Sequence, residues 1–415
     1  MKIIDVKYFP IIAGWYCDDK EAVEHGNVKS DHYLLTGNPV TNGFNSVREV
    51  GTGIGVAITL ENQRVFYGDG TSVTYAGTAG RDRLFRYEDY VDYCKLVIND
   101  LVINQDTEDF THICAEIENP VNLSDSHTAI RYAVSSALLE ASASVCNISK
   151  ASFLRKQFNI PKINKNIKYM IQGGNDWYNS VDKAIYHRVD ALPHALIHSV
   201  ENDFGPTGEI LLDYAKWIKQ RIYEHNVESY YDPIFHFDCY GTIGRAFQND
   251  LGKISDYIVK LENTITPFKL QLESPIEMGN KTDQIKIFAD LKQTLKNRNS
   301  KTLIIADEWC NDLSDISDFI ESKSVDMIQI KMPDLGSITQ SVKAVNICHE
   351  NGVKAYLGGS CNETDLNAKN AVHVAIATGA EQILVRPGMG IDEGYSIMKN
   401  EEFRILSEIG QAHAG

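Results

Sequence analysis

The sequence predicts an α/β protein, with an N-terminal α+β capping domain followed by a C-terminal (β/α)₈-type, TIM-like barrel. Eight short apolar runs alternate with helical patterns in the C-terminal part, which is typical of a parallel sheet closed into a barrel. The N-terminal part has a mixed rhythm without that alternation. A chain of 415 residues has room for two domains, and we place them at residues 1–160 and 161–415.

In the N-terminal part, strand patterns come first and helical patterns follow. Two β-like runs flank the polar segment Glu61-Asn62-Gln63, which predicts a hairpin. Apolar residues then recur at helical spacing, so that Ile130 and Ala133 share one face. The expected strands are 3–6, 56–60 and 64–67, and the expected helices are 87–103 and 127–144.

In the C-terminal part, most apolar runs are separated by helical patterns such as 208–224 and 281–296. A doubly wound sheet is the alternative to a barrel, but no convincing glycine-rich phosphate turn follows the first run. The eight expected barrel strands are 167–172, 189–196, 234–239, 268–273, 302–307, 327–332, 353–357 and 382–386.

Composition narrows the class of partner. The chain has 40 Lys and Arg against 56 Asp and Glu, a formal net charge of −16, which disfavours nucleic acid or an anionic membrane as the main partner. No apolar run approaches the length of a membrane span, and the N-terminus has no clear signal peptide. Eight cysteines without a CxxC pair indicate reduced thiols and a cytoplasmic protein.

Several expected strands end in a chemically capable residue. The carboxyl ends of barrel strands converge on one face, and a charge there is costly unless it is paired or binds a metal. Asp238, Glu273 and Asp307 are spaced 35 and 34 residues apart, about one strand–helix unit. Three carboxylates in phase favour Mg²⁺, with Mn²⁺ second, over helix capping or pairing with Lys or Arg.

Two further residues are candidates for proton transfer. Lys331 lies on the same strand face as Gln329, and a lysine beside a divalent cation can act as a general base. The alternatives for Lys331 are a surface lysine and the Schiff-base lysine of a metal-independent aldolase, which the carboxylates disfavour. His194 is either a satisfied core histidine or a second acid/base group on the opposite face of a substrate.

Two loops and one further strand end complete the candidate site. The segments 358–363 and 387–390 are glycine-containing loops whose backbone N–H groups could hold a carboxylate, a weak signal by itself. We expect Cys361 to act through packing or its backbone, because no base can be named beside it. Gln172 ends the first expected barrel strand.

At these positions the sequence resembles the methylaspartate ammonia-lyase family of the enolase superfamily. The matching segments lie along the whole chain. They are GRDRLF (80–85), HTAIRY (127–132), VDALPHALI (189–197), YGTIG (240–244), ADEWCN (306–311), QIKMPDLG (329–336), GGSCNET (358–364) and RPGMGIDEG (386–394).

The resemblance implies elimination of ammonia from L-threo-3-methylaspartate to give mesaconate. It implies Mg²⁺ bound by the three carboxylates, K⁺ as an activator, a small amino diacid as substrate, and a homodimer. Lys331 would remove the proton from the threo substrate and His194 would serve the opposite face. The implied substrate-binding residues are Gln172, Gln329, Ser360 and Cys361, with Tyr356, Leu384, Met170 and Thr74 on the pocket wall and lid.

The chain departs from the family pattern at several positions. The family usually has Thr at Ser360, Phe at Met170 and Gln near Thr74, with Thr at Met332 and Lys at Arg386. These changes leave the proposed catalytic set intact and touch the pocket wall and lid. Two alternatives therefore stay open: a lyase, dehydratase or epimerase acting on a different amino or hydroxy diacid, and a catalytically silent member that binds a metabolite or partner.

Overall fold

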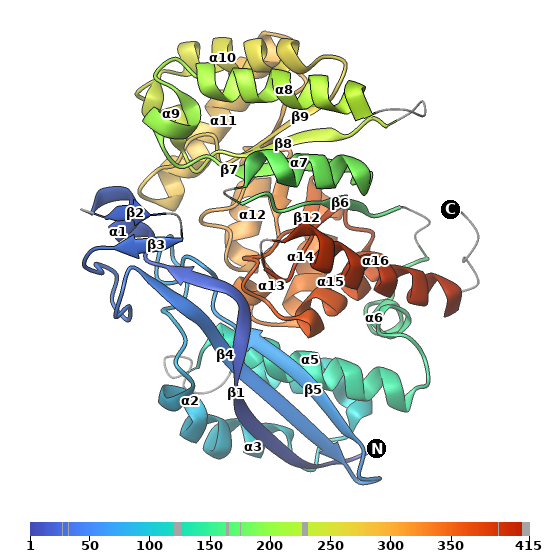
Figure 1. The fold of residues 1–415 in the computed structure, drawn as a ribbon. Coiled ribbons are helices and arrows are strands. Elements are labelled where there is room, and N and C mark those ends of the chain that lie inside the picture. Colours follow the sequence, from blue (N-terminus) through green and yellow to red (C-terminus); the bar gives the residue numbers. More distant parts are fainter. Residues whose placement is uncertain are drawn as a thin grey trace.

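The structure is a computed structural model that describes residues 1–26, 28–31, 33–119, 126–162, 166–174, 176–225, 231–388 and 390–408. It has a closed barrel of eight parallel strands preceded by a smaller part built on a long antiparallel sheet (Figure 1). The predicted fold class is confirmed, and the doubly wound alternative is wrong because the sheet closes. The domain boundary at residue 160 stays a prediction.

The N-terminal part is built around a three-stranded antiparallel sheet in the order β1–β4–β5. The predicted hairpin is confirmed, but β4 extends well before residue 56 and β1 continues far beyond residue 6. These strands are β1 (Ile3–Asp18), β4 (Arg48–Leu60) and β5 (Val65–Thr71), and a short hairpin adds β2 (Lys29–Asp31) and β3 (Leu34–Thr36).

Helix α5 (Thr128–Val145), predicted as 127–144, packs on β4 and β5. Gly70 allows this close approach, because a Cβ there would lie 1.8 Å from the carbonyl oxygen of Ala129. The other N-terminal helices are α1 (Lys20–His25), α2 (Tyr87–Tyr93), the π-helix η1 (Cys94–Ile98), α3 (Asn99–Val102), the 3₁₀-helix η2 (Thr107–Asp109), α4 (Phe110–Glu118) and α6 (Lys150–Phe158). The helix predicted at 87–103 is thus a continuous run of three helical segments, α2, η1 and α3.

The barrel strands are neighbours in the order β6–β7–β8–β9–β10–β11–β12–β13, and β13 closes on β6. All the described pairs between them are parallel. Each of the eight barrel strands lies within an apolar run identified in the sequence. The strands are β6 (Lys168–Met170), β7 (Ala191–Leu196), β8 (Ile234–Asp238), β9 (Leu270–Glu273), β10 (Leu303–Ala306), β11 (Met327–Gln329), β12 (Lys354–Leu357) and β13 (Gln382–Leu384).

Helices surround the barrel (Figure 1). Buried apolar side chains of these helices and of the strands form one core cluster. Parallel strands need such crossover segments, and burial on both faces explains why the strand runs are almost continuously apolar. They are α7 (Trp177–Tyr186), η4 (Val200–Phe204), α8 (Glu209–His225), α9 (Thr242–Ala246), α10 (Leu251–Ile265), α11 (Lys281–Asn297), α12 (Leu313–Glu321), α13 (Met332–Leu335), α14 (Ile338–Glu350), α15 (Asp365–Thr378) and α16 (Ile391–Glu408).

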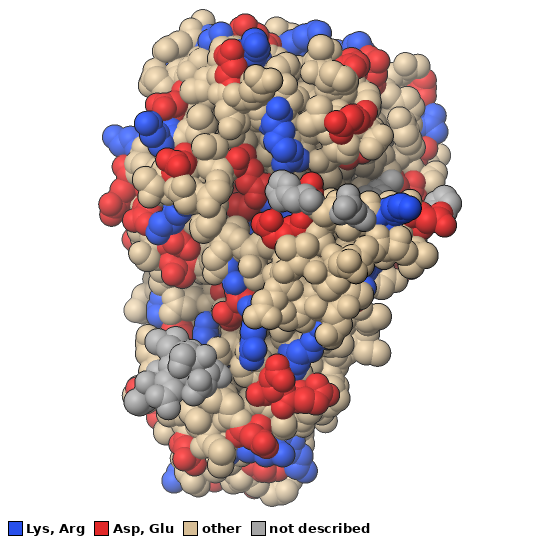
Figure 2. All heavy atoms as spheres, turned by 90° about the vertical axis from the view of Figure 1, so that its left-hand side faces the viewer, with Lys and Arg blue, Asp and Glu red and all other residues tan. Residues whose placement is uncertain are grey.

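Several elements of the N-terminal part contact the barrel part, including β5 and α6, which both pack against α15. Helix α5 packs against α13 and α14, while the α1–β3 end of the sheet lies beside the barrel near β7 and α9 (Figure 1). Figure 2 views the molecule from that side and shows Lys and Arg interspersed with Asp and Glu over both parts. Within the described segments, no helix combines the length and apolar character needed to cross a membrane.

Candidate active site

Five consecutive strands around the barrel carry the ionisable residues predicted from the sequence. His194 lies in β7, Asp238 and Glu273 end β8 and β9, Asp307 directly follows β10, and Lys331 comes two residues after β11. The strands are parallel, so these positions meet at one end of the barrel. Strands β7 and β11 are four places apart in a ring of eight, so His194 and Lys331 approach from opposite sides.

Among the described residues, one compact group could hold a metal ion. One ligand atom from each of His194, Asp238 and Glu273 lies within 4.8 Å of the others. The His194 Nε2 atom is 3.5 Å from Asp238 Oδ2 and 3.9 Å from Glu273 Oε2. Two of the three predicted carboxylates therefore lie together, with His194 as the third member in place of Asp307.

The protonation of this group shows why a cation fits it. All three side chains are buried, at 3%, 3% and 0% exposure for His194, Asp238 and Glu273. Burial, together with the neighbouring carboxylates, raises the pKa of Asp238 and of Glu273 well above the ordinary range. A divalent cation would remove that penalty, since buried like charges are stable only with a counter-charge. Asp238 and Glu273 supply the carboxylate oxygens that Mg²⁺ prefers as ligands.

His194 is held with one ring nitrogen facing the carboxylates. Its Nδ1 atom lies 2.6 Å from the amide oxygen of Gln172, which can only accept, so Nδ1 carries the hydrogen. Burial, followed by the electrostatic interaction with the neighbouring His236, lowers the pKa of His194 well below its usual value. The ring is thus neutral, and its unprotonated Nε2 points toward Asp238 and Glu273.

Asp307 is bound by two cationic side chains. Lys331 Nζ donates to Asp307 Oδ2 at 2.7 Å, and Arg81 Nη2 lies 3.3 Å from Asp307 Oδ1. On the neighbouring strand, the Gln329 amide donates to Glu273. The structure therefore joins the predicted base to a predicted metal ligand, and fixes a second ligand through the glutamine that shares the face of Lys331.

A cavity of about 310 Å³ lies between the N-terminal part and the barrel mouth. Eight predicted site residues line it together with side chains of the N-terminal part. These eight are Thr74, Gln172, His194, Asp238, Asp307, Gln329, Lys331 and Ser360. The cavity has polar side chains at the barrel end and is large enough for a small diacid.

The other predicted pocket residues lie deeper. Met170, Tyr356, Cys361 and Leu384 are fully buried and belong to one apolar cluster inside the barrel. Neither they nor Glu273 are among the described residues that line the cavity. They support the floor in this structure, and their contact with a substrate stays a prediction.

The loop after β12 is held by contacts with Thr74 and Arg386 and by one hydrogen bond within the loop. Thr74 Oγ1 donates to the Ser360 carbonyl oxygen at 2.6 Å, and the Ser360 N–H donates to Glu363 Oε2 at 3.0 Å. Glu363 in turn forms a buried ion pair with Arg386 at 3.2 Å. Two departures from the family pattern, Thr74 and Arg386, thus act on the same loop. In the loop after β13, residue 389 lies outside the described residues.

Cys361 is not suited to act as a nucleophile. Burial raises the pKa of its thiol to about 12, so the reactive thiolate does not form at neutral pH. Its backbone is in the left-handed region, with a φ of 56°. Its carbonyl oxygen accepts a hydrogen bond of 2.7 Å from the N–H of Gly388. The packing or backbone role expected for Cys361 in substrate binding stays a prediction.

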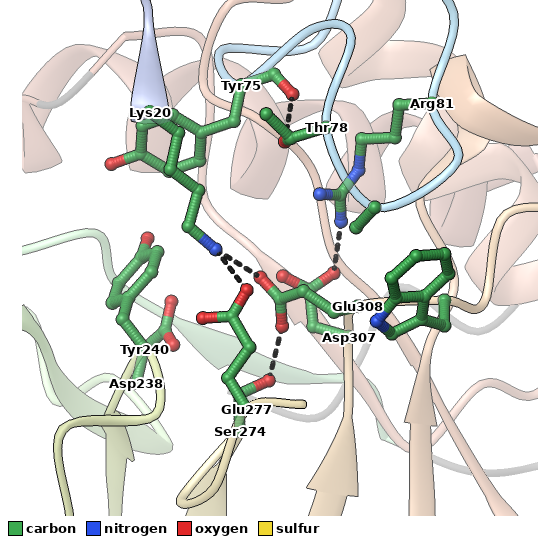
Figure 3. Close-up of polar contacts among 12 residues, drawn as sticks. Lys20, Tyr75, Thr78, Arg81, Asp238, Tyr240, Ser274, Glu277, Asp307 and Glu308 are labelled. Carbon is green, nitrogen blue, oxygen red and sulfur yellow. Dashed lines mark hydrogen bonds and ion pairs between the residues drawn. The ribbon is translucent and has the colours of Figure 1, made fainter. Parts of the chain in front are cut away.

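Sequence reasoning missed two cations that the N-terminal part contributes (Figure 3). Lys20 Nζ lies 2.5 Å from Glu277 Oε1 and 3.6 Å from Glu308 Oε1, and Arg81 binds Asp307, the residue before Glu308. Burial would raise the pKa of Glu308, but Lys20 and Arg81 hold it at about 2. The only available signal was the position of Arg81 in the GRDRLF segment.

His236 was also missed. Its Nε2 atom lies 2.7 Å from Glu273 Oε2, and its Nδ1 atom lies 2.9 Å from Gln271 Oε1. Burial lowers the pKa of His236 to about 3. The alternation of β8 could have revealed it, because His236 and Asp238 are two residues apart and point to the same face.

Comparison with known proteins identifies the family. The family model for the methylaspartate ammonia-lyase N-terminus matches residues 1–159, and the model for its C-terminus matches residues 162–411. The chain belongs to the methylaspartate ammonia-lyase family. It is 42% identical over 409 residues to methylaspartate ammonia-lyase 2 of Carboxydothermus hydrogenoformans, covering 98% of each chain.

Solved structures agree. The Mg complex of β-methylaspartase from Clostridium tetanomorphum has a TM-score of 0.92 at 39% identity, covering 99% of this chain and 100% of that one. The Citrobacter amalonaticus enzyme containing (2S,3S)-3-methylaspartic acid has a TM-score of 0.95 at 38% identity, with the same coverage. The family resemblance is confirmed, and the chain is a lyase enzyme rather than a silent binding protein.

Proposed function

We propose that the protein eliminates ammonia from L-threo-3-methylaspartate, or from a close substituted aspartate, to give mesaconate. The observation that carries the proposal is the placement of Lys331 and His194 on opposite sides of the barrel mouth, both lining one cavity, with buried carboxylates on the strands between them. The Mg²⁺ and (2S,3S)-3-methylaspartic acid named for the two solved relatives support this choice of cofactor and substrate.

Lys331 would act as the base for the threo substrate. Its amine lines the cavity and donates to Asp307 at 2.7 Å, and it would exchange that contact for the proton on the methyl-bearing carbon. The C–H and C–N bonds break, a carbon–carbon double bond forms, Lys331 keeps the proton and ammonia leaves. His194 Nε2, which is unprotonated, would serve the same carbon from the opposite face.

Asp238, Glu273 and Asp307 would hold Mg²⁺. When bound, Mg²⁺ supplies positive charge that binds a substrate carboxylate and offsets the negative charge left by the departing proton. Gln172, Gln329 and the Ser360 loop would orient the two carboxylates. The Thr74 contact holds the lid segment on that loop and would exclude water during the reaction.

An ultraviolet assay tests the proposal. L-threo-3-methylaspartate, Mg²⁺ and K⁺ are mixed with the protein, and the conjugated diacid is followed by absorbance, with aspartate and Lys331→Ala as comparisons. We expect rapid product from the wild type, little from aspartate, and a loss of about 100- to 10,000-fold in Lys331→Ala. A folded Lys331→Ala variant with full activity would contradict the mechanism.

A second candidate is elimination or epimerisation of a different amino or hydroxy diacid at the same site. The Thr74–Ser360 contact favours it, because both partners differ from the usual family residues. Exchange of deuterium next to a carboxylate, without release of ammonia, would support this candidate over the lyase reaction.

Three further properties complete the proposal. Mn²⁺ would replace Mg²⁺ in part, K⁺ would activate the enzyme, and two copies would form a homodimer. Activity with each cation and sedimentation of the purified chain measure these directly. The cytoplasmic location stays a prediction from the cysteine usage.

A further inference from the structure

Arg81 reaches the barrel from a strained turn of the N-terminal part. Ala79 and Gly80 both have positive φ, 49° and 81°, and a non-glycine residue in that region needs support from its surroundings. The support comes from the barrel, because Asn311 Nδ2 donates to the Ala79 carbonyl oxygen at 2.7 Å. The turn is thus fixed against the loop after β10.

The guanidinium of Arg81 joins two carboxylates on different elements. Its Nε donates to Asp334 Oδ2 at 3.0 Å. Its Nη2 lies 3.3 Å from Asp307 Oδ1 (Figure 3). Asp307 follows β10, while Asp334 lies in α13, three residues after Lys331. The Arg81 side chain is 1% exposed, so both contacts form away from bulk water.

This arrangement restricts how Asp307 can turn. The planar guanidinium presents its N–H groups in a fixed fork, so an anchor at Asp334 also sets where Nη2 meets Asp307. Arg81 contacts one carboxylate oxygen of Asp307, Oδ1, and Lys331 Nζ lies 2.7 Å from both Oδ1 and Oδ2. A ligand held in this way needs less reordering when it binds a cation.

We propose that Arg81 is a positioning residue that fixes the orientation of Asp307 for cation binding, acting as a two-point brace between Asp307 and Asp334. This inference rests on the proposed metal site. It assigns a role in that site to a side chain of the N-terminal part, from a turn 226 residues before Asp307. The capping part would then complete the metal site as well as cover it.

Titration calorimetry with Mg²⁺ alone, on full-length protein treated with a chelator, tests the proposal. Removal of the positive charge in Arg81→Met would by itself tighten Mg²⁺ binding, because it removes a Coulomb repulsion between the guanidinium and the cation. A lost brace instead weakens it, by about 10- to 100-fold, the usual range for a residue that supports a ligand. The two explanations therefore predict opposite signs.

Two further variants keep the test decisive if Arg81→Met does not fold. Arg81→Lys keeps the charge but lacks the fork, so we expect weakened binding without rescue. Asp334→Asn removes the second anchor, and we expect it to weaken binding as well. In the Arg81→Met/Asp334→Asn double variant, the loss should equal that of Arg81→Met alone, because the brace is already broken.

Arg48→Met is the matched control. Arg48 also lines the cavity from the N-terminal part, but it binds Asp18 of that same part, with Nη2 2.6 Å from Oδ2. We expect its Mg²⁺ affinity to equal that of the wild type. Unchanged or tighter Mg²⁺ binding in Arg81→Met, or full rescue by Arg81→Lys, would overturn the proposed role of Arg81 but leave the proposed metal site standing. A wild type that binds no Mg²⁺ would overturn the proposed metal site with it.

Discussion

Two arcs of the barrel mouth share one closed sheet but differ in chemistry. The arc from β7 to β11 carries His194, three carboxylates and Lys331, whereas the strands of the arc β12–β13–β6 contribute Tyr356, Leu384 and Met170. Four members of the ionisable arc, His194, Asp238, Asp307 and Lys331, line the cavity, whereas Tyr356, Leu384 and Met170 are not among its described lining residues. The ionisable side chains thus come from one run of consecutive strands, whereas the buried apolar cluster inside the barrel draws on strands of both arcs.

The largest effect is expected from breaking the ionisable arc. Asp238→Asn removes a buried carboxylate from the proposed metal site, so Mg²⁺ affinity and turnover should fall by more than about 100-fold, beyond the range for a supporting residue. Calorimetry and the ultraviolet assay measure both. Asp203→Asn, another acid on the cavity wall, is the control and should bind Mg²⁺ normally.

A change in the apolar arc should act on stability instead. Met170 is fully buried in the barrel cluster, so Met170→Ala should lower the free energy of unfolding by about 2–5 kcal/mol through lost packing. Denaturant unfolding measures this. Mg²⁺ affinity should stay at the wild-type value, and a parallel loss of Mg²⁺ binding would mean that the two arcs are not separate.

The pH dependence of stability sharpens the comparison. The pKa of Asp238 and of Glu273 is raised in the folded chain, so without metal the folded state binds more protons than the unfolded state. The stability without metal therefore falls as pH rises from about 4 through the raised pKa values. Saturating Mg²⁺, at 100 times its Kd, should add about 2.7 kcal/mol.

Thermal unfolding with and without Mg²⁺ at pH 5.5 and 8 checks this. The shift caused by Mg²⁺ should be larger at pH 8, because its ligands must be deprotonated. In Met170→Ala the shift should equal that of the wild type. A larger Mg²⁺-induced shift of the unfolding temperature at pH 5.5 than at pH 8 would mean that Mg²⁺ does not bind at Asp238 and Glu273.

The smallest effect is expected in the loop after the apolar arc. Ser360→Thr keeps the hydroxyl and leaves the backbone oxygen that accepts from Thr74, so it adds only a methyl group. One such group changes selectivity by at most about 1–3 kcal/mol. The ratio of kcat/KM for 3-methylaspartate and aspartate measures the change, and a lost activity would show that the loop itself had moved.

The ionisable arc could be predicted from the sequence because strand and helix lengths repeat. Asp238, Glu273 and Asp307 recur once per strand–helix unit, and parallel strands bring such positions to one end. The grouping of His194 with Asp238 and Glu273 could not be predicted, because it depends on side-chain directions around a closed ring. The residue order along the chain does not contain those directions.

Lys20 and Arg81, the two cations that the N-terminal part contributes to the site, were not predicted, for a different reason. Lys20 lies 257 residues before Glu277, and Arg81 lies 226 residues before Asp307. No local period links such pairs, since they meet only when the two parts of the chain pack together. The predicted start of β1 at Ile3 was right, but the predicted strand was too short. Alternate residues after Val6 are exposed at the sheet surface, so the apolar pattern ends there although the strand continues.

The central claim is that Lys331 and His194 serve opposite faces of one substrate. The most direct measurement is kcat/KM for the threo and erythro diastereomers of 3-methylaspartate in the wild type, Lys331→Ala and His194→Ala. The account predicts that Lys331→Ala loses the threo reaction far more than the erythro reaction, and that His194→Ala shows the reverse. Equal loss of both diastereomers in both variants would contradict it.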